Sequence, residues 1–412
     1  MDDKSNKLLL VPILTVLFVM IGYQYICPAG STSCRFGTGE SFPLSKHPAL
    51  ESPDGFRSKF NFTREDLERH VDFDMKGEDV IVFLHIQKTG GTTFGRHLVR
   101  NIRLQRPCDC RTGLKKCSCH RPGKADSWLF SRFSTGWSCG LHADWTELTN
   151  CVPAVMNKKQ KKDSKRRNFY YITLLRDPVS RYLSEWKHVQ RGATWKTALH
   201  MCDGRPPTPD ELPACYSSED WTGVSLEEFM ACQSNLANNR QTRMLADLSL
   251  VGCYNLSSMS EERRAELLLS SAKRNLRHMA FFGLTEFQRK TQFLFERTFG
   301  LHFISAFTQI NGTRAAGVTV GTSTRRRIEE LNALDVQLYE YARELFLRRV
   351  QYCHQQERQE VRERRREQRR KTKEQKPSQF SKPGEGERED VEEEIKTVRG
   401  VTEDYSSQVV RW

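Results

Sequence analysis

Residues 88–93 combine a lysine, two glycines and three threonines, a set of residue types that can bind phosphate. They follow the apolar run Val80–Ile86 and precede residues 94–103, in which apolar side chains recur every four positions. This order predicts a strand, a glycine-rich turn and a helix. Glycines let the turn point its amide groups inward, and the helix N-terminus adds unpaired donors and partial positive charge. The expected contributors are Lys88, Thr89, Gly90, Gly91, Thr92 and Thr93.

The turn differs from the loop that binds nucleotide triphosphates. In that loop the lysine follows the glycines, whereas Lys88 precedes Gly90 and Gly91. No predicted strand elsewhere carries an Asp or Glu placed plainly to hold Mg²⁺. A kinase is therefore disfavoured, although a turn with a purely structural role stays open on these residues alone.

A second candidate anion site follows another strand pattern, Phe169–Leu175. Pro178 suits the first turn of a helix, which puts Arg176 at the end of the strand and Ser184 about two turns into the helix. Open α/β sheets bind ligands at the carboxyl ends of their strands. Two anion sites at one sheet edge predict a ligand with two separated phosphates.

These motifs resemble those of a known family. Lys-Thr-Gly-Gly-Thr-Thr at 88–93 and Arg-Asp-Pro-Val-Ser-Arg-Tyr-Leu-Ser at 176–184 are similar to the two signatures by which Golgi sulfotransferases bind PAPS, 3′-phosphoadenosine 5′-phosphosulfate. Residues 83–97, 128–145 and 281–291 resemble heparan-sulfate 6-O-sulfotransferases, and residues 401–412 are most similar to their isoform 3 type. The resemblance covers roughly Asp72 to Val350.

The resemblance implies a fold, a reaction and a set of site residues. The fold is a P-loop-like sulfotransferase α/β fold, with a central parallel sheet flanked by helices and a long C-terminal helix. The reaction is transfer of the sulfuryl group from PAPS, without a metal, to the 6-hydroxyl of glucosamine in heparan sulfate. PAPS would contact His85, Ile86, Gln87, Lys88, Thr89, Gly90, Gly91, Thr92, Thr93, Arg176, Ser184, Thr308, Gln309, Ile310, Thr313 and Arg314. Heparan sulfate would contact Lys115, Lys116, Arg132, Trp137, His142, His188 and Trp195.

Sulfuryl transfer resembles phosphoryl transfer, in which charge builds on the leaving oxygen during an in-line attack. Lys88 is the candidate cation for that charge. A primary hydroxyl also needs a base, and the chain has 11 histidines. Residue types alone do not choose among them, and His85 on the predicted strand could equally fill the core. By resemblance the base is His142, the histidine of Gly-Leu-His-Ala-Asp-Trp.

Charge and hydropathy suggest a polyanionic partner and a membrane anchor. The net charge is +14, which favours nucleic acid, an anionic membrane or a sulfated polysaccharide. Residues 8–26 are uncharged and mostly apolar, long enough to cross a bilayer, and no clear cleavage site follows. They predict a signal anchor in preference to a removed signal peptide. The chain is therefore expected to be a single-pass type II membrane protein of the Golgi with a lumenal catalytic domain.

Cysteines and glycosylation sequons agree with that compartment. Asn61, Asn255 and Asn311 each begin an Asn-x-Ser/Thr sequon. The 13 cysteines favour disulfides, although the Cys-x-Cys pairs at 108–110 and 117–119 leave a zinc site as an alternative. The odd count predicts at least one free or intermolecular thiol. An oxidising compartment argues against nucleic acid as the polyanion.

The remaining segments complete the predicted organisation. A cytoplasmic tail (1–7), the anchor (8–26) and a lumenal stem (27–71) precede the catalytic domain (72–350), a charged helix (351–376) and a disordered tail (377–412). Residues 158–167 carry seven basic side chains, which form either a solvated loop or a contact for heparin. A heparin-binding protein without catalytic activity is therefore a third functional alternative, beside a sulfotransferase and a kinase. Further elements are expected near residues 225–230, 235–248, 279–284, 285–299 and 328–345.

Overall fold

The computed structural model describes residues 59–158, 166–308 and 318–374 of the 412-residue chain. The predicted anchor, most of the stem, the tail, Asn311 and most of the basic run lie outside the described residues. Among the described residues, no helix is both long and apolar enough to cross a membrane.

A four-stranded parallel sheet lies at the centre of the fold, in the order β2-β1-β3-β4. β1 (Val80–Leu84) and β3 (Phe169–Leu175) are neighbours, with Val82 opposite Tyr171. β2 (Leu129–Phe130) and β4 (Phe281–Leu284) form the edges. Because these strands are parallel and adjacent, the carboxyl ends of β1 and β3 lie side by side at the same end of the sheet. The predicted parallel α/β architecture is confirmed.

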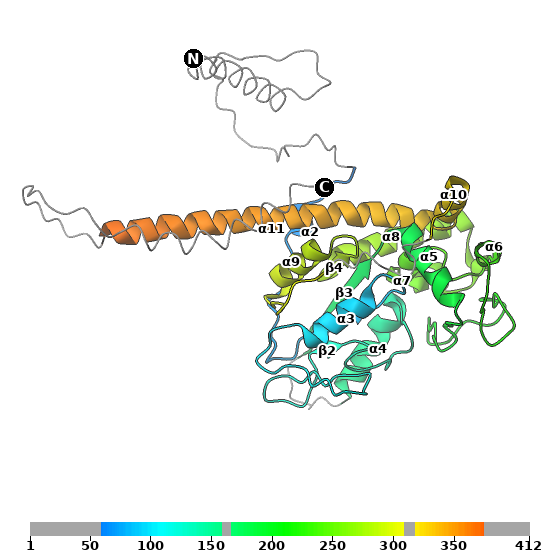
Figure 1. Cartoon of the computed structure of the whole chain (residues 1–412), viewed down its shortest axis with the longest axis horizontal. Coiled ribbons are helices and arrows are strands. Elements are labelled where there is room, and N and C mark those ends of the chain that lie inside the picture. Colours follow the sequence, from blue (N-terminus) through cyan, green and yellow to red (C-terminus); the bar gives the residue numbers. More distant parts are fainter. Residues whose placement is uncertain (1–58, 159–165, 309–317, 375–412) are drawn as a thin grey trace, which may run out of the picture. The chain divides into compact units, whose positions relative to one another are not determined.

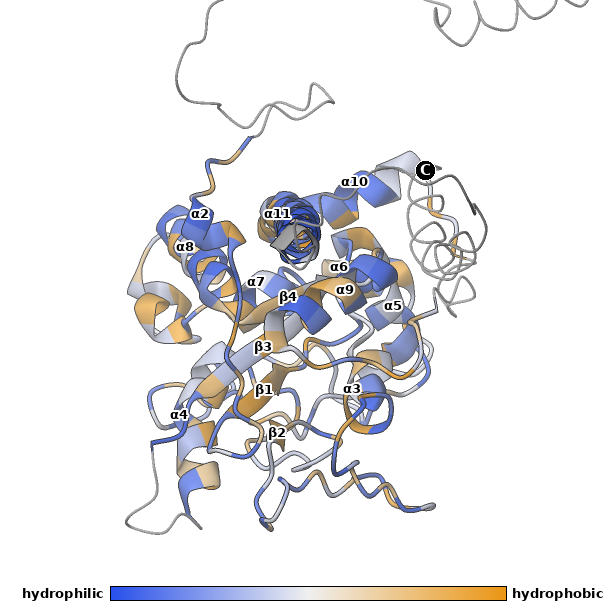
Figure 2. Cartoon of the chain, turned by 90° about the vertical axis from the view of Figure 1, so that its left-hand side faces the viewer, coloured by the Kyte–Doolittle hydropathy of each residue, from blue (hydrophilic) through white to orange (hydrophobic). Residues whose placement is uncertain are grey.

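Helices cover both faces of this sheet (Figure 2). α3 (Gly91–Arg100) and α9 (Gln288–Phe299) share one face, where Phe94 stacks edge-on against Phe295. α4 (Trp145–Asn157) and α8 (Glu261–His278) lie on the opposite face. All five residues of β1 are buried, as expected for a strand covered on both sides.

The connection from β3 to β4 is long and contains several short helices. α5 (Pro178–Val189) starts at Pro178, and the Asp177 side chain accepts a hydrogen bond from Ser180 N, as at a helix N-cap. This connection also contains α6 (Leu226–Ala231), α7 (Arg240–Leu245), the 3₁₀ turns η1 (Leu248–Val251) and η2 (Leu256–Ser258), and α8, whereas α2 (Arg64–Leu67) precedes β1.

The C-terminal helical region differs from the prediction of one helix over residues 328–345. It consists of α10 (Thr322–Leu331) and α11 (Ala333–Glu374), separated at Asn332. Asn332 is fully buried, and its side chain accepts a hydrogen bond from Asn239 N. α11 then continues for 42 residues, through residue 350 and beyond the body of the domain (Figure 1).

Three helices, α2, α4 and α8, and the strand β2 were not predicted. α8 buries only Ser271, Ala272 and Leu276, so its apolar pattern in the sequence is weak. α4 contains Pro153, a residue that usually argues against a helix interior. β2 has two residues, too few for an alternating pattern.

Five disulfides are present in the described part of the chain. Both Cys-x-Cys pairs are oxidised, as Cys108–Cys119 and Cys110–Cys117, so the disulfide alternative is confirmed over zinc. The remaining bonds are Cys139–Cys151, Cys202–Cys253 and Cys215–Cys232. Cys353 is a free thiol, half-buried on α11.

The basic run at 158–167 includes one arginine with a structural role. Arg167 is buried and forms ion pairs with Asp126 at 2.9 Å and Glu78 at 3.4 Å. Arg167 is therefore not available to a heparin chain.

Candidate functional site

A cavity of about 440 Å³ opens where β1 and β3 end. Its lining combines residues of the glycine-rich turn, the β3–α5 junction and two later loops. The lining residues are His85, Gln87, Lys88, Gly90, Gly91, Thr92, Arg132, His142, Arg176, Ser184, Lys187, His188, Arg191 and Trp195. Five of them are Lys or Arg and none is Asp or Glu, so the cavity suits an anion.

The glycine-rich turn presents its backbone to this cavity. Lys88 and Gly90 adopt left-handed conformations, with φ of 66° and 78°. A Cβ on Gly91 would lie 2.2 Å from His85 Cδ2, so only glycine fits there. The turn leads directly into α3, whose first amide groups have no intrahelical acceptor and can therefore bind an anion.

Arg176 and Ser184 lie in the same cavity as the turn. The Arg176 guanidinium donates a hydrogen bond to the Lys88 carbonyl at 3.2 Å. Gln241 fixes the Arg176 backbone by accepting from its N–H and donating to its carbonyl, each at 2.9 Å. Thr285 donates from its hydroxyl to both the Thr89 and Leu175 carbonyls, joining the turn to the end of β3. The two predicted anion motifs therefore form one site.

His142 lies beside His85 at the edge of this site. The ring centroids are 4.7 Å apart, and His142 Nδ1 is 2.9 Å from the His85 carbonyl oxygen. A carbonyl only accepts, so His142 Nδ1 carries the proton and Nε2 keeps a lone pair. The His142 backbone is left-handed, with φ of 52°. Such strained residues cluster at active sites.

Burial keeps both imidazoles neutral. It lowers the pKa of His142 to about 4. The hydrogen bond to the His85 carbonyl raises this pKa, whereas the positive charge of Arg240 lowers it further. Burial also lowers the pKa of His85 well below its usual value, with His142 adding to the effect. A neutral His142 can accept a proton, as a general base must.

A buried ion cluster supports the indole next to His142. Glu185 accepts a hydrogen bond from Trp195 Nε1 at 3.1 Å, and the Trp195 ring meets the His142 ring edge-on at 5.2 Å. Glu185 also pairs with Arg181 and Arg240. Burial alone would raise the pKa of Glu185, but the two arginines outweigh it and lower that pKa to about 2. The ion cluster therefore holds Trp195 in place through its hydrogen bond to Glu185.

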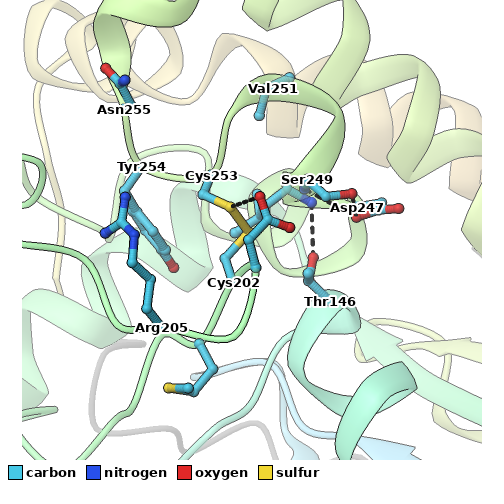
Figure 3. The surroundings of a disulfide bond; sticks show 12 residues. Thr146, Cys202, Arg205, Asp247, Ser249, Val251, Cys253, Tyr254 and Asn255 are labelled. Atoms are coloured by element: carbon cyan, nitrogen blue, oxygen red, sulfur yellow. Dashed lines mark hydrogen bonds between the residues drawn. A yellow bond between two sulfur atoms is a disulfide. The ribbon is translucent and has the colours of Figure 1, made fainter.

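The capping residues of α4 hold His142 from the other side. Asp144 and Glu147 form reciprocal cap hydrogen bonds of 3.0 Å, and the second Glu147 oxygen accepts from Met201 N at 2.9 Å. Met201 precedes the Cys202–Cys253 disulfide, which joins this loop to the segment before α8 next to Thr146 of α4 (Figure 3). The disulfide and the cap together position the loop that carries His142.

The other predicted acceptor residues line an adjoining cavity of about 680 Å³. Lys115, Lys116 and Trp137 lie there, and Arg132 lines both cavities. The Arg132 guanidinium stacks 5.2 Å from the Trp137 ring, and that ring lies 4.8 Å from His142. A chain molecule could therefore run from the second cavity past His142.

Some predicted residues lie outside the first cavity. Ile86 and Thr89 are buried beneath the turn, where the Thr89 hydroxyl donates to the Ile86 carbonyl at 3.0 Å, so they support the turn. Thr93 and Thr308 are exposed and do not line the cavity. Gln309, Ile310, Thr313 and Arg314 are outside the described residues.

Two cations of the cavity, Lys187 and Arg191, were not predicted from the sequence. They follow Ser184 by three and seven positions, as does His188 by four. That spacing places them on one face of α5 and its continuation. The 3.6-residue period was therefore a signal that could have found them.

The cavity fits a phosphate-bearing donor better than a divalent metal. His85 Nδ1 and Gln87 Oε1 are buried at its wall without a hydrogen-bond partner in the described structure, and both could bond a ligand. Elsewhere in the described residues, the one group of three possible metal ligands is Cys202, Asp203 and Cys253. Its two sulfurs form a disulfide and offer no thiolate.

Comparison with known proteins agrees with this geometry. Residues 71–342 match a family model described as "Sulfotransferase family". The chain belongs to the sulfotransferase family.

Curated relatives narrow the position of the chain within this family. It is 65% identical to heparan-sulfate 6-O-sulfotransferase 3-B of Danio rerio and 57% identical to heparan-sulfate 6-O-sulfotransferase 3 of Homo sapiens, each over the full length of both chains. It is 63% identical to heparan-sulfate 6-O-sulfotransferase 2 of Homo sapiens, over 88% of this chain and 60% of that protein. The resemblance to the isoform 3 type is confirmed.

Proposed function

We propose that this sulfotransferase moves the sulfuryl group of PAPS to the 6-hydroxyl of glucosamine residues in heparan sulfate. The observation that carries the proposal is the single cavity shared by Lys88, Arg176, Ser184 and His142. Two anion motifs and a neutral imidazole meet there, as transfer from a doubly phosphorylated donor to a hydroxyl requires. The names of the full-length relatives supply the acceptor and the position of sulfation.

In this proposal the turn binds the 5′ end of the donor, which supplies the sulfuryl group. Lys88 and the amide groups of Gly90, Gly91 and Thr92 stabilise negative charge as it develops on the leaving phosphate. Arg176 and Ser184 hold the 3′-phosphate and so distinguish PAPS from the analogue that lacks this group. Thr308, Gln309, Ile310, Thr313 and Arg314 would cover the nucleotide from the C-terminal side.

His142 acts as the base toward the acceptor hydroxyl. Its Nδ1–H is committed to the His85 carbonyl, which leaves Nε2 to accept the proton. Trp195 and Trp137 flank the imidazole and offer flat apolar faces to sugar rings. Lys115, Lys116, Arg132 and His188 would contact the sulfate and carboxylate groups of the polysaccharide.

The expected setting of this chemistry is the Golgi lumen, with residues 8–26 as a type II membrane anchor. The five disulfides support an oxidising compartment. Asn61 and Asn255 are exposed, as N-glycosylation requires, and Asn311 is the third expected site.

Transfer of radiolabelled sulfate tests the proposal. The purified chain, given labelled PAPS and heparan sulfate, should release labelled 6-O-sulfated disaccharides after lyase digestion. Label at the 2- or 3-position would refute the regiospecificity but not the reaction. Parallel reactions with labelled ATP and Mg²⁺ should transfer nothing, and phosphate transfer there would indicate a kinase instead.

A further inference from the structure

The second half of α11 projects beyond the domain as an exposed, strongly charged helix (Figure 1). Residues 361–372 are all exposed, whereas Leu338, Leu345 and Phe346 of the same helix are fully buried. The projecting part plays no role in the catalytic cavity. It is nevertheless a continuous extension of a helix anchored in the core.

The charges of this segment are sorted onto two faces. At about 100° per residue, six arginines fall within a sector of roughly 140°. We call them the arginine stripe: Arg358, Arg362, Arg365, Arg366, Arg369 and Arg370. Four glutamates, Glu357, Glu360, Glu363 and Glu367, occupy the opposite sector. The stripe is about 18 Å long, at 1.5 Å per residue.

Contacts with the domain orient the two faces. Glu360 pairs with Arg297 of α9 at 3.0 Å and with Arg364 at 3.5 Å. Glu360 lies on the same side of α11 as the buried residues Ala342 and Phe346, from which it is separated by five and four helical turns respectively. The acidic face therefore continues the core-facing side, and the arginine stripe faces away from the domain.

We propose that the arginine stripe is a second binding site for the sulfated polysaccharide, separate from the catalytic cavity. A row of guanidinium groups on a rigid helix matches a linear chain of sulfate and carboxylate groups. An anionic membrane fits less well, because helices that bind membranes carry an apolar face, and Val361 is the one exposed large apolar residue in this segment. This inference rests on the proposed function for the identity of the polyanion.

The position of the arginine stripe predicts an effect on long acceptor chains only. α10 lies at one end of α11 and packs against α5, whose Ser184 and Lys187 line the cavity, whereas the projecting segment lies at the other end of α11 (Figure 1). Only a long polysaccharide could reach both the stripe and the cavity. Binding at the stripe would raise the local concentration of acceptor groups at the cavity, which lowers KM for long chains and leaves short acceptors unaffected.

Two double variants test the proposal with equal loss of charge. Arg362→Gln/Arg369→Gln removes two positive charges from the stripe, and Arg364→Gln/Lys371→Gln removes two from the opposite face of the same helix. Glutamine retains helix propensity. The first variant should bind heparin about threefold to tenfold more weakly, with a salt dependence reduced by roughly 1.5 in log–log slope, by analogy with nucleic acids. The second should bind nearly like the unmodified chain.

Kinetics then separate this site from the active site. With a hexasaccharide acceptor, all three proteins should have the same kcat and KM, which also shows that they are folded. With long heparan sulfate, only the stripe variant should have a raised KM. Equal heparin affinity and equal long-chain KM for the two variants would overturn the proposal. If no protein transfers sulfate, the proposed function fails, while heparin binding still tests the stripe.

Two other partners give distinct results. Loss of binding to vesicles of anionic phospholipid, with unchanged heparin affinity, would assign the stripe to a membrane. A change of mass by light scattering in the stripe variant alone would assign it to contacts between copies of this chain. Either result replaces the polysaccharide as the partner.

Discussion

The donor half and the acceptor half of the site are built in different ways. The donor half consists of a turn and a helix N-terminus that follow a buried strand directly, so residues 80–100 contain most of its parts. The acceptor half gathers Lys115, Trp137, His142 and Trp195 from loops far apart in the sequence. Disulfides and a buried ion cluster hold those loops.

This difference separates two kinds of dependence. The donor half uses backbone groups whose positions are fixed by the sheet, so few substitutions there should be tolerated. The acceptor half uses side chains on supported loops, so loss of a support should weaken acceptor binding before it affects the transfer step. Variants at the junction should affect catalysis most.

The largest effect is expected at His142, where the halves meet. His142→Ala should lower kcat about 10²-fold to 10⁴-fold, the usual contribution of a general base, with PAPS affinity retained. His97→Ala is the control, because His97 is half-buried on α3 and stacks on Phe307 at 4.2 Å. Steady-state kinetics and calorimetry measure the two quantities. An undiminished kcat in His142→Ala would exclude His142 as the base.

Lys88→Ala should have the next largest effect and should act through the donor half. Loss of one charge that stabilises the transition state typically costs about 10²-fold to 10³-fold in kcat, and the acceptor KM should not change. Lys187→Ala tests another lysine of the same cavity, whose ammonium lies 4.2 Å over the Trp186 ring. Similar losses in the two variants would mean that the cavity needs only general positive charge.

Gly91→Ala should damage the donor half by a steric route. The new Cβ would displace the ring of His85, and the backbone carbonyl of the same residue holds His142. Because the base would then be misplaced, we expect roughly a tenfold to hundredfold loss of kcat. Gly95→Ala is a matched control on the same helix, since its Cβ would lie 2.6 Å from Phe133. That variant should lose stability but keep its affinity for PAPS, as thermal unfolding and calorimetry can measure.

The contrast between the halves also explains what the sequence predicted. The donor half was predictable because one contiguous stretch encodes a strand, a turn and a helix, and β3 was predicted with its bounds, Phe169–Leu175. Lys88 and Arg176 indeed line one cavity. Their shared contact, the Lys88 carbonyl, is a backbone group that no residue pattern reveals.

The supports of the acceptor half were not predictable in this way. Glu185 reaches Arg240 across 55 positions, and Glu147 reaches Met201 across 54. Such pairs leave no local pattern, and neither does a disulfide partner. Trp137 and Trp195 were named only because the family resemblance supplied them. α4, which is capped two residues after His142, was hidden by Pro153.

Removal of the Cys202–Cys253 disulfide should affect only the acceptor half. Cys202→Ala/Cys253→Ala releases a link across 51 positions, which should cost about 2–4 kcal/mol of stability. The Met201–Glu147 contact should loosen with it, and the acceptor KM should rise about threefold to tenfold while PAPS affinity stays constant. Cys215→Ala/Cys232→Ala removes a bond across 17 positions and serves as the control. A loss of PAPS affinity in the first variant alone would mean that the halves are coupled.

The smallest effect is expected in the pH dependence, where the acceptor half acts on the base. The pKa of His142 is lowered to about 4 chiefly by burial, so His142 stays neutral and basic as pH falls through 6.5 and becomes protonated only near pH 4. Activity limited by this group should therefore be lost at a lower pH than for an exposed histidine. The stability of the fold should also decrease as pH falls. The unfolded chain takes up this proton at a higher pH than the folded chain does, which favours unfolding below about pH 6.5.

Trp195→Ala should expose His142 and raise its pKa toward the usual value. The acid limb of kcat/KM for the acceptor, measured at saturating PAPS, should then move up by about one pH unit relative to the unmodified chain. Trp195→Phe keeps the apolar cover and loses only the hydrogen bond to Glu185, so its acid limb should stay in place. Equal shifts in the two variants would implicate the Glu185 hydrogen bond instead of burial. An unmoved limb in both would mean that the acceptor half binds the sugar without tuning the base.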